Sequence, residues 1–373
     1  MGGVEQVISQ IARSTSALGI KTDVLSLTSG RDLQTIEIDG YSVHRVKCHL
    51  RIASTSFSAT AFRRFSELAN KADIIHYHYP WPFMDMVHFV TKTNKPTLVT
   101  YHSDIVRQKQ LLKYYYPLQQ RFLGSVNKII ATSSNYCATS HVLEKFSSKV
   151  SVIPIGIDKN TYSVPGSDRL QYWRDIFGSK FFLFVGVLRY YKGLHILLDA
   201  AKGIDCPIVI VGAGPIEREL RVQAKESGLN NVYFMGYLPD SEKVALLMLC
   251  YGVVFPSHLR SEAFGISLLE GTMYGKPMIS SEIGTGTTFV NIANETGLVV
   301  PPNNVSALQN AMRYLLDNPQ SAAAMGRRAA LRYWMHFTAD KMASSYINVY
   351  SELMRQKVGE IINNKAPCKA HVV

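Results

Sequence analysis

Two glutamates eight residues apart, Glu262 and Glu270, have residue types and a spacing that suit a ligand site. Glu262 lies in a loop that follows the apolar run 251–255, which is predicted to be a buried strand. Glu270 lies about two turns into the helix predicted after Gly265. Both carboxylates could therefore face one crevice at different depths. The alternative is that Glu262 is a helix-terminal charge favoured by the dipole and Glu270 a solvated helix residue.

The start of this predicted helix is suited to phosphate. A helix N-terminus presents unpaired N–H groups and a partial positive charge. Gly265 lies at that start, and its lack of a side chain lets a ligand approach the backbone closely. The order strand, loop and helix therefore predicts an anion site at the junction.

A second junction of strand and helix carries two cations. A strand is predicted over 181–185 and a helix over 194–201, and the loop between them contains Arg189 and Lys192. Two cations between a strand end and a helix start are well placed to neutralise a diphosphate together with the helix dipole. The alternative is that both are solvated loop cations.

The segment from Glu262 through Phe264 and Gly265 to Glu270, preceded by Val-Phe-Pro-Ser, resembles the signature of the retaining GT-B glycosyltransferases of family four, the glycosyl transferases group 1. The similarity runs through nearly the whole chain and is closest to mannosyltransferases that build bacterial lipopolysaccharide O-polysaccharide. It implies an α/β fold with two Rossmann-like parallel-sheet domains facing a cleft. The first domain would bind the acceptor and the second the nucleotide-sugar.

A chain of 373 residues also exceeds one ordinary core, so two domains are expected from length alone. We expect the first domain over 1–160 and the second over 169–335. The resemblance implies a crossover helix over 336–360 that packs on the first domain, and 361–373 reads as a disordered tail. In the family a strand precedes the loop that holds Gly2 and Gly3, so the first domain is expected to lack that strand and to have unpaired strand edges.

Three histidines lie at the ends of two predicted strands of the first domain. Strand alternation places His76 and His78 on the same side, where they could ligate a metal together with His102. This is the basis of an alternative function, a metal hydrolase, although no further carboxylate cluster completes such a site. The resemblance instead assigns His102 to contact with the transferred sugar or the acceptor near the reacting centre.

The family resemblance assigns roles to the other candidate residues. Glu262 would hold the sugar hydroxyls and stabilise charge, and Glu270 would accept hydrogen bonds from the ribose. Lys192 matches the family lysine, whereas Arg189 stands two positions after the usual arginine and is our substitute for it. The backbone N–H groups of the donor site are those of Phe264, Gly265 and Ile266. Gly2 and Gly3 would approach the donor phosphates or the acceptor.

The implied reaction is transfer of mannose from GDP-mannose, with retention, to a lipid-linked glycan in O-antigen biosynthesis. Cations take the place of a metal, and no Asp-x-Asp is present, so no metal or other cofactor is expected. The alternatives are a UDP-sugar donor and a non-catalytic nucleotide-sugar binder. The sequence does not distinguish guanine from uracil.

Charge and cysteine usage indicate location and partners. The net charge is +12, and residues 1–150 carry 18 Lys and Arg against 10 Asp and Glu. A basic first half favours an anionic partner, and no nucleic-acid-binding motif is present, so a membrane surface is the expected one. The segment 107–123 mixes cations with Leu and Tyr at helical spacing, as in a helix lying on headgroups; the alternative is an ordinary amphipathic helix. Five scattered cysteines, with no signal peptide or membrane span, predict a cytoplasmic protein.

Overall fold

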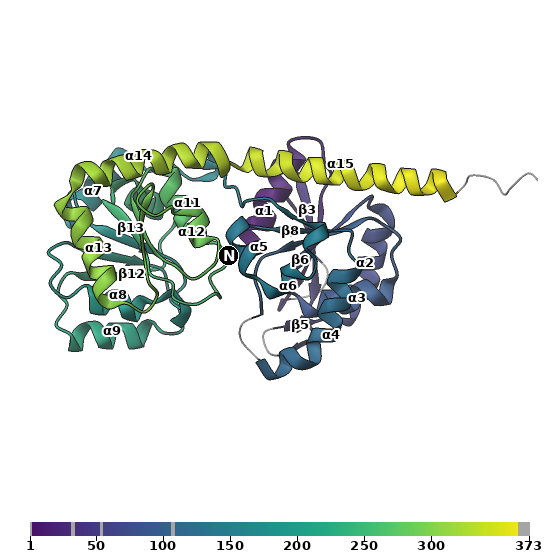
Figure 1. Cartoon of the computed structure of the whole chain (residues 1–373), viewed down its shortest axis with the longest axis horizontal. Coiled ribbons are helices and arrows are strands. Elements are labelled where there is room, and N and C mark those ends of the chain that lie inside the picture. The colour runs from purple at the N-terminus through teal and green to yellow at the C-terminus, as the bar shows by residue number, and fades with distance from the viewer. Residues whose placement is uncertain (1, 31–33, 53–54, 106–108, 365–373) are drawn as a thin grey trace, which may run out of the picture. The chain divides into compact units, whose positions relative to one another are not determined.

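The computed structural model describes residues 2–30, 34–52, 55–105 and 109–364. The chain forms two compact units (Figure 1). Unit 1 contains Met1–Ala131, Val142–Ile153 and Asp340–Val373, and unit 2 contains Thr132–His141 and Pro154–Ala339. Residues 132–141 belong to unit 2, although they fall within the range expected for the first domain. Hydrogen bonds hold them there, from Asn135 Nδ2 to Thr288 Oγ1 at 3.1 Å and from Thr139 Oγ1 to the Gly284 carbonyl at 2.5 Å.

Unit 2 contains a six-stranded sheet in which every neighbouring pair is parallel. The strands are β10 (Phe182–Val185), β11 (Ile208–Val211), β12 (Val232–Gly236), β13 (Gly252–Phe255), β14 (Met278–Ser281) and β15 (Gly297–Val300). Their spatial order, β12-β11-β10-β13-β14-β15, is that of a doubly wound nucleotide-binding fold. The direction of winding reverses between β10 and β13, and ligands of such sheets bind at the carboxyl ends of the strands beside that point.

The strands of unit 2 form because short apolar runs are buried on both faces. Every residue of β10, β11 and β13 is buried, as expected for a parallel sheet covered by helices. The helices of this unit are α5 (Ser134–Thr139), α7 (Ser167–Phe177), α8 (Leu194–Ala200), α9 (Glu217–Glu226), α10 (Asp240–Leu249), α11 (Ile266–Met273), α12 (Thr287–Val290), α13 (Val305–Asp317) and α14 (Pro319–His336). The α/β architecture that the family resemblance implies is therefore present in unit 2.

Unit 1 divides its strands among three sheets rather than the one parallel sheet that a Rossmann-like domain implies. The strands are β1 (Asp23–Thr28), β2 (Gln34–Ile38), β3 (Tyr41–Lys47), β4 (Leu50–Ile52), β5 (Thr55–Phe57), β6 (Ile75–Tyr79), β7 (Thr97–Tyr101), β8 (Lys128–Ala131) and β9 (Val150–Val152). Three form the order β1-β3-β2, four form the parallel order β6-β7-β8-β9, and β4 pairs with β5. The sheets are separate because, within the described ranges, no strand pairs with the outer edge of β1 or of β6.

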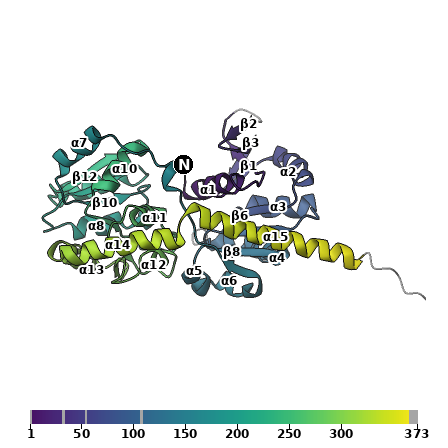
Figure 2. The same ribbon diagram turned by 90° about the horizontal axis from the view of Figure 1, so that it is seen from above.

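The helices of unit 1 include one that joins it from the far end of the sequence. They are α1 (Gly3–Ser16), α2 (Ala59–Lys71), α3 (Pro82–Thr91), α4 (Lys109–Ser125), the short α6 (His141–Glu144) and α15 (Ala339–Asn364). Helix α15 runs across β6 and β8 (Figure 2), where Tyr350 contacts His76 and Glu352 lies 3.9 Å from Lys128. It continues to Asn364, so residues 361–364 are helical rather than part of the expected tail, whose remainder lies outside the described residues. None of the described helices is long and apolar enough to cross a bilayer.

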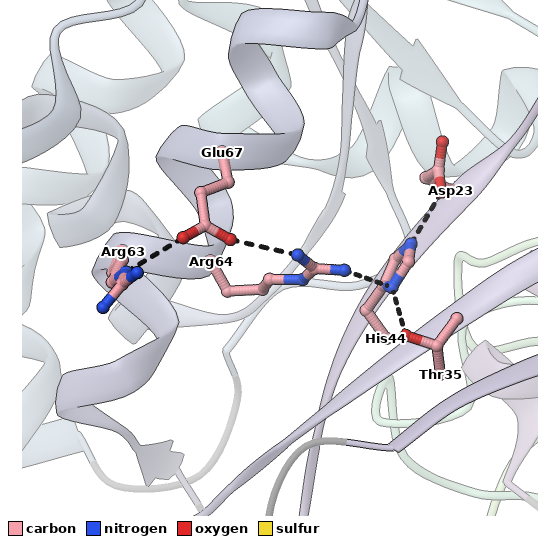
Figure 3. A network of polar contacts seen from close by, with 6 residues as sticks. All are labelled: Asp23, Thr35, His44, Arg63, Arg64 and Glu67. Atoms are coloured by element: carbon pink, nitrogen blue, oxygen red, sulfur yellow. Dashed lines mark hydrogen bonds and ion pairs between the residues drawn. The ribbon is translucent and has the colours of Figure 1, made fainter.

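Helix α2 is attached to the β1-β3-β2 sheet by the polar network in Figure 3. His44 on β3 uses both ring nitrogens, Nε2 at 2.6 Å from Asp23 Oδ1 and Nδ1 at 2.8 Å from Arg64 Nη2. The guanidinium group can only donate, so Nδ1 of His44 accepts its hydrogen bond. The protonated Nε2 then donates a hydrogen bond to Asp23. Arg64 is itself paired with Glu67 at 3.0 Å. The network therefore fixes the histidine tautomer as it joins helix to sheet.

A buried carboxylate between α3 and α4 should make the stability of unit 1 depend on pH. Burial raises the pKa of Asp85 to about 7, against an opposing hydrogen bond from Tyr115. Between pH 4 and pH 7 the unfolded chain releases a proton that the folded protein keeps, so this group makes stability fall as pH rises through that window. We expect Asp85→Asn to raise the free energy of unfolding at pH 8 by at most about 4 kcal/mol, and with it the melting temperature, and to change both little at pH 4. An equal gain at both pH values, or the same gain from the exposed Asp73→Asn, would contradict this.

Candidate active site

The two loops predicted to bind the donor lie at the ends of adjacent strands. The loop with Arg189 and Lys192 follows β10, and the loop with Glu262 follows β13. These two strands pair in parallel through Phe182 and Gly252, so both loops leave the same edge of the sheet, at its switch point. The structure therefore brings together two sequence motifs that are 70 residues apart.

Lys192 and Glu262 form a buried ion pair between these loops. The Lys192 ammonium group donates to Oε2 of Glu262, and Ser257 Oγ donates to the same oxygen at 3.3 Å. Each of the two charged side chains is only 11% exposed. The ammonium nitrogen also lies 4.6 Å from the centre of the Phe255 ring. The pair thus places one cation and one carboxylate side by side where a ligand of this sheet would bind.

The backbone holds the two loops in register. Lys192 ends a 3-10 turn, and Gly193 after it has a φ of 70°, in the left-handed region. A Cβ atom at Gly193 would lie 2.0 Å from the Pro256 carbonyl oxygen, so only glycine permits this approach. The N–H of His258 donates to the Tyr191 carbonyl at 3.0 Å. The pair is therefore held by interlocked backbone rather than by long flexible side chains alone.

The start of α11 presents the free N–H groups that the sequence predicted. Gly265 precedes the helix with a φ of 91°, a conformation that favours glycine. Within the described chain, the N–H groups of Phe264, Gly265 and Ile266 donate no hydrogen bond. Ser267 Oγ donates to the Val185 carbonyl at 2.7 Å and so ties the start of α11 to the end of β10. An anion near Lys192 would find backbone donors at this helix start.

Glu270 forms a second cluster of its own. Its Oε1 accepts hydrogen bonds from Lys243 Nζ at 2.9 Å and from Tyr162 OH at 3.1 Å, and the residue is 3% exposed. Burial alone would lower the pKa of Lys243, but the charge and hydrogen bond of Glu270 raise it above its ordinary value. Sequence reasoning missed Lys243 and Tyr162, since neither belongs to a motif. Their role is visible only from their contact with Glu270.

Arg189 does not take part in either cluster. Its side chain is exposed, and within the described residues it forms no ion pair. The carbonyl of Arg189 accepts a hydrogen bond from the N–H of Lys192 at 2.9 Å, so Arg189 begins the turn that Lys192 ends. The structure thus joins Lys192 to Glu262 and leaves Arg189 as a free cation beside them.

Unit 1 places His102 in a buried position against a second histidine. Nε2 of His102 lies 2.9 Å from Nδ1 of His78, and burial lowers the pKa of His102 to about 4, so the ring is neutral at pH 7. Both nitrogens of His76 are occupied, by Tyr350 OH at 2.9 Å and by Thr100 Oγ1 at 2.7 Å. His76 therefore cannot join the other two as a metal ligand, and the described residues contain no group of three His, Cys, Asp or Glu in a metal-binding arrangement. This arrangement of the three histidines gives the metal-hydrolase hypothesis no support.

Gly2 and Gly3 lie at the start of α1. Gly2 precedes the helix in an extended conformation and Gly3 is its first residue, and both are exposed. The carbonyl of Gly2 accepts the N–H of Gln6 at 3.1 Å. Their predicted role at the donor phosphates or the acceptor stays a prediction.

Known protein families match both halves of the chain. Residues 176–332 match the family described as glycosyl transferases group 1, and residues 1–161 match glycosyltransferase family 4. The D-rhamnosyltransferase WbpZ of Pseudomonas aeruginosa is 58% identical over 91% of this chain and 89% of its own length. The O-antigen chain mannosyltransferase C of Escherichia coli is 48% identical over 95% of this chain and 96% of its own length.

Solved structures share the fold over nearly the whole length. Sucrose-phosphate synthase from Thermosynechococcus elongatus aligns with a TM-score of 0.77 and 22% identity, covering 95% of this chain and 94% of its own. Anabaena HepE in complex with UDP and glucose aligns with a TM-score of 0.74 and 19% identity, covering 94% and 96%. At such identities the likeness concerns the fold alone, and it confirms the predicted α/β fold class, GT-B.

Proposed function

Because the chain belongs to the glycosyl transferases group 1 family, we propose that this glycosyltransferase moves mannose from GDP-mannose, with retention of configuration, onto a lipid-linked glycan acceptor in O-antigen biosynthesis. The nucleotide-sugar binds mainly to unit 2 and the acceptor to unit 1. The similarity to an O-antigen chain mannosyltransferase supports the choice of sugar and process.

The observation that carries the proposal is the buried pair of Lys192 and Glu262 at the switch point of the sheet. A diphosphate that enters this site meets the Lys192 ammonium group, the exposed Arg189 and the free N–H groups at the start of α11. Glu262 then holds the sugar hydroxyls on the other side of the cation. Glu270, further along α11, accepts hydrogen bonds from the ribose through the oxygen that Lys243 and Tyr162 leave free.

The chemical step that fits these groups is a front-face displacement. The bond between the anomeric carbon and the diphosphate oxygen lengthens, and its electron pair stays on that oxygen. The acceptor hydroxyl oxygen forms the new bond from the same face and gives its proton to the diphosphate oxygen. Lys192, Arg189 and the N–H groups of Phe264, Gly265 and Ile266 stabilise the negative charge on the leaving group, and Glu262 stabilises the positive charge on the sugar. His102 contacts the sugar or the acceptor as a neutral imidazole.

D-rhamnose is a second candidate for the transferred sugar. The similarity to a D-rhamnosyltransferase favours it, and D-rhamnose differs from D-mannose only by loss of the 6-hydroxyl group. A pocket that hydrogen-bonds a 6-hydroxyl rejects the deoxy sugar strongly, whereas an apolar pocket discriminates weakly between them. The two donors must therefore be compared directly.

The test offers GDP-mannose, GDP-D-rhamnose, UDP-glucose and UDP-N-acetylglucosamine to purified protein with a synthetic lipid-linked acceptor, beside Glu262→Ala. Turnover of GDP-mannose that is lost in the variant is the expected result, and the anomeric configuration of the product reports retention. Preference for GDP-D-rhamnose would change the proposed sugar to D-rhamnose and leave the proposed donor site unchanged. If GDP raised the melting temperature but no donor turned over, the protein would be a nucleotide-sugar binder.

Transfer is expected to persist in a chelator. Lys192 and Arg189 supply the positive charge that a divalent cation would otherwise bring to the diphosphate. We expect the rate in millimolar EDTA to equal the rate without it. Loss of transfer in EDTA, restored by magnesium or manganese, would contradict a cofactor-free site.

Helix α4 is the proposed contact with an anionic membrane surface on the cytoplasmic side. Lys113 and Arg121 are exposed, and Tyr114 is 86% exposed, as expected for cations and an aromatic ring among headgroups. Tyr115 instead packs inward against Asp85, and Arg107 lies outside the described residues. Sedimentation of the protein with anionic but not with neutral vesicles would support the contact. If Lys113→Glu sedimented with anionic vesicles as well as the wild type does, the result would count against α4 as the contact.

A further inference from the structure

Three imidazole rings are stacked in a line on one face of unit 1. His76 and His78 lie two residues apart on β6, and His102 follows the last residue of the neighbouring strand β7. Ring centres are 4.5 Å apart for His76 and His78 and 5.2 Å apart for His78 and His102, with interplanar angles of 24° and 20°. We call these three residues the histidine ladder.

The inner end of the ladder is held by hydroxyl groups. The two ring nitrogens of His76 contact Tyr350 and Thr100, as described above, and Thr100 Oγ1 lies 2.7 Å from Tyr346 OH. Tyr346 also packs its ring against His76 at 5.2 Å. Because both tyrosines come from α15, this helix fixes the inner ring.

The outer end of the ladder is the hydrogen bond between His78 and His102. The N–H of His102 also donates to the Tyr79 carbonyl at 2.9 Å, so β6 holds both the backbone and the ring of His102. In the part of the chain that the structure describes, Nδ1 of His102 has no hydrogen-bond partner. This nitrogen is therefore left for a ligand.

The ladder is uncharged at neutral pH, and this constrains its protons. Burial, with a smaller effect of the neighbouring histidines, lowers the pKa of His76 to about 3 and that of His78 well below its ordinary value. A neutral imidazole carries a single N–H, so only one of the two nitrogens in the bond between His78 and His102 holds a proton. If His78 donates, Nδ1 of His102 is a donor, and if His102 donates, its Nδ1 is an acceptor. The state of the outer nitrogen is thus coupled to the tautomer of His78.

We propose that His78 is a positioning residue that holds the His102 ring in one orientation and, through their hydrogen bond, sets whether Nδ1 donates to or accepts from the sugar or the acceptor. The inference rests on the proposed function, in which His102 contacts the sugar or the acceptor near the reacting centre. A His102 ring that exchanged tautomers would be a donor in some molecules and an acceptor in others, so its hydrogen bond to the ligand would differ from molecule to molecule. Removing the outer-shell group that orients a metal-ligating histidine typically costs about 10- to 100-fold in affinity or activity, and we expect a loss of the same order here.

The test compares His78→Phe, which keeps an aromatic ring in the stack, with His78→Gln, which can still hydrogen-bond to His102. The first readout needs no substrate: the ¹⁵N chemical shifts of the His102 ring in histidine-labelled protein at pH 7, assigned through His102→Gln. We expect one protonated and one bare nitrogen in the wild type and averaged shifts in His78→Phe. The second readout is transfer, where kcat should fall about 10- to 100-fold in His78→Phe with donor KM nearly unchanged, and recover largely in His78→Gln.

Tyr350→Phe is the matched control, because it removes a hydroxyl at the inner end of the ladder and keeps the bond between His78 and His102. It should leave the His102 shifts and kcat as in the wild type. Three results would each overturn the proposal. They are mixed His102 tautomers in the wild type, unchanged His102 shifts in His78→Phe, and changed His102 shifts in His78→Phe with an unchanged kcat. A wild-type protein with one His102 tautomer that transfers no sugar would instead contradict the proposed function, so the two failures are distinguishable.

Discussion

Replacing Glu262 by glutamine is expected to lower kcat for sugar transfer by about 10²- to 10³-fold, with a much smaller change in donor KM. The side chain is buried and its Oε2 is bound by Lys192 and Ser257. Glutamine has the same shape and still accepts these hydrogen bonds. It lacks the negative charge that stabilises the sugar as its bond to the diphosphate lengthens, so the loss should appear in the transition state rather than in binding.

Glu282→Gln is the control for this variant. Glu282 is exposed on a neighbouring loop of unit 2, where its Oε1 accepts the N–H of Gly284 at 2.8 Å. The Glu282→Gln variant should transfer sugar at the wild-type rate. The melting temperatures of Glu262→Gln and Glu282→Gln report whether each variant is folded. A Glu262→Gln enzyme with full activity would remove this carboxylate from the mechanism.

Replacing Lys192 by methionine is expected to lower kcat/KM by about 10²- to 10³-fold and to weaken GDP binding. Lys192 is the cation held at the switch point, 11% exposed and packed on the Phe255 ring. In the proposed mechanism its charge acts on the diphosphate both in the bound donor and as the leaving group forms. Arg189→Ala in the same loop should have a smaller effect, because that side chain is exposed and unsupported.

Measurements of stability distinguish two proposed roles of Lys192, which are to neutralise the diphosphate and to pair with the Glu262 carboxylate. Its loss leaves the Glu262 carboxylate buried without its counter-ion, which is costly, so Lys192→Met should lower the melting temperature. Adding Glu262→Gln should restore much of that loss, since the unpaired charge is gone, yet activity should stay low. Recovery of activity in the double variant would show that neither charge is needed for transfer and that Lys192→Met acts through the unpaired Glu262 carboxylate. An Arg189→Ala effect as large as that of Lys192→Met would move the phosphate role to Arg189.

Local sequence pattern was sufficient for the strands of unit 2 and for most of the candidate residues that lie next to them. The strands of unit 2 are short apolar runs, and glycine at positions 193 and 265 marks left-handed turns next to them. Period-two alternation correctly placed His76 and His78 on one face of β6. Each of these features depends on neighbours along the chain, which is why the sequence was enough.

Contacts across large sequence separations were not predictable in the same way. Lys243 and Tyr162 meet Glu270 from 27 and 108 residues away, and no motif marks either of them. Tyr350 reaches His76 across 274 residues, and this bond removes the metal site that alternation had allowed. In unit 1 the strands divide among separate sheets, because strand pairing depends on which edges meet and not on the apolar pattern of any one strand.

The sequence alone therefore determined the strand, loop and helix units and the identity of Glu262, Lys192, Gly265 and Glu270 as candidate site residues, since motif spacing and periodicity are local properties. Its family resemblance implied the α/β fold class. Only the tertiary structure decided that Lys192 binds Glu262, that Glu270 has partners of its own, and that His102 is held by His78. The physical reason is that strand order and helix packing choose which side chains meet, and burial then requires each polar group brought inside to find a partner there.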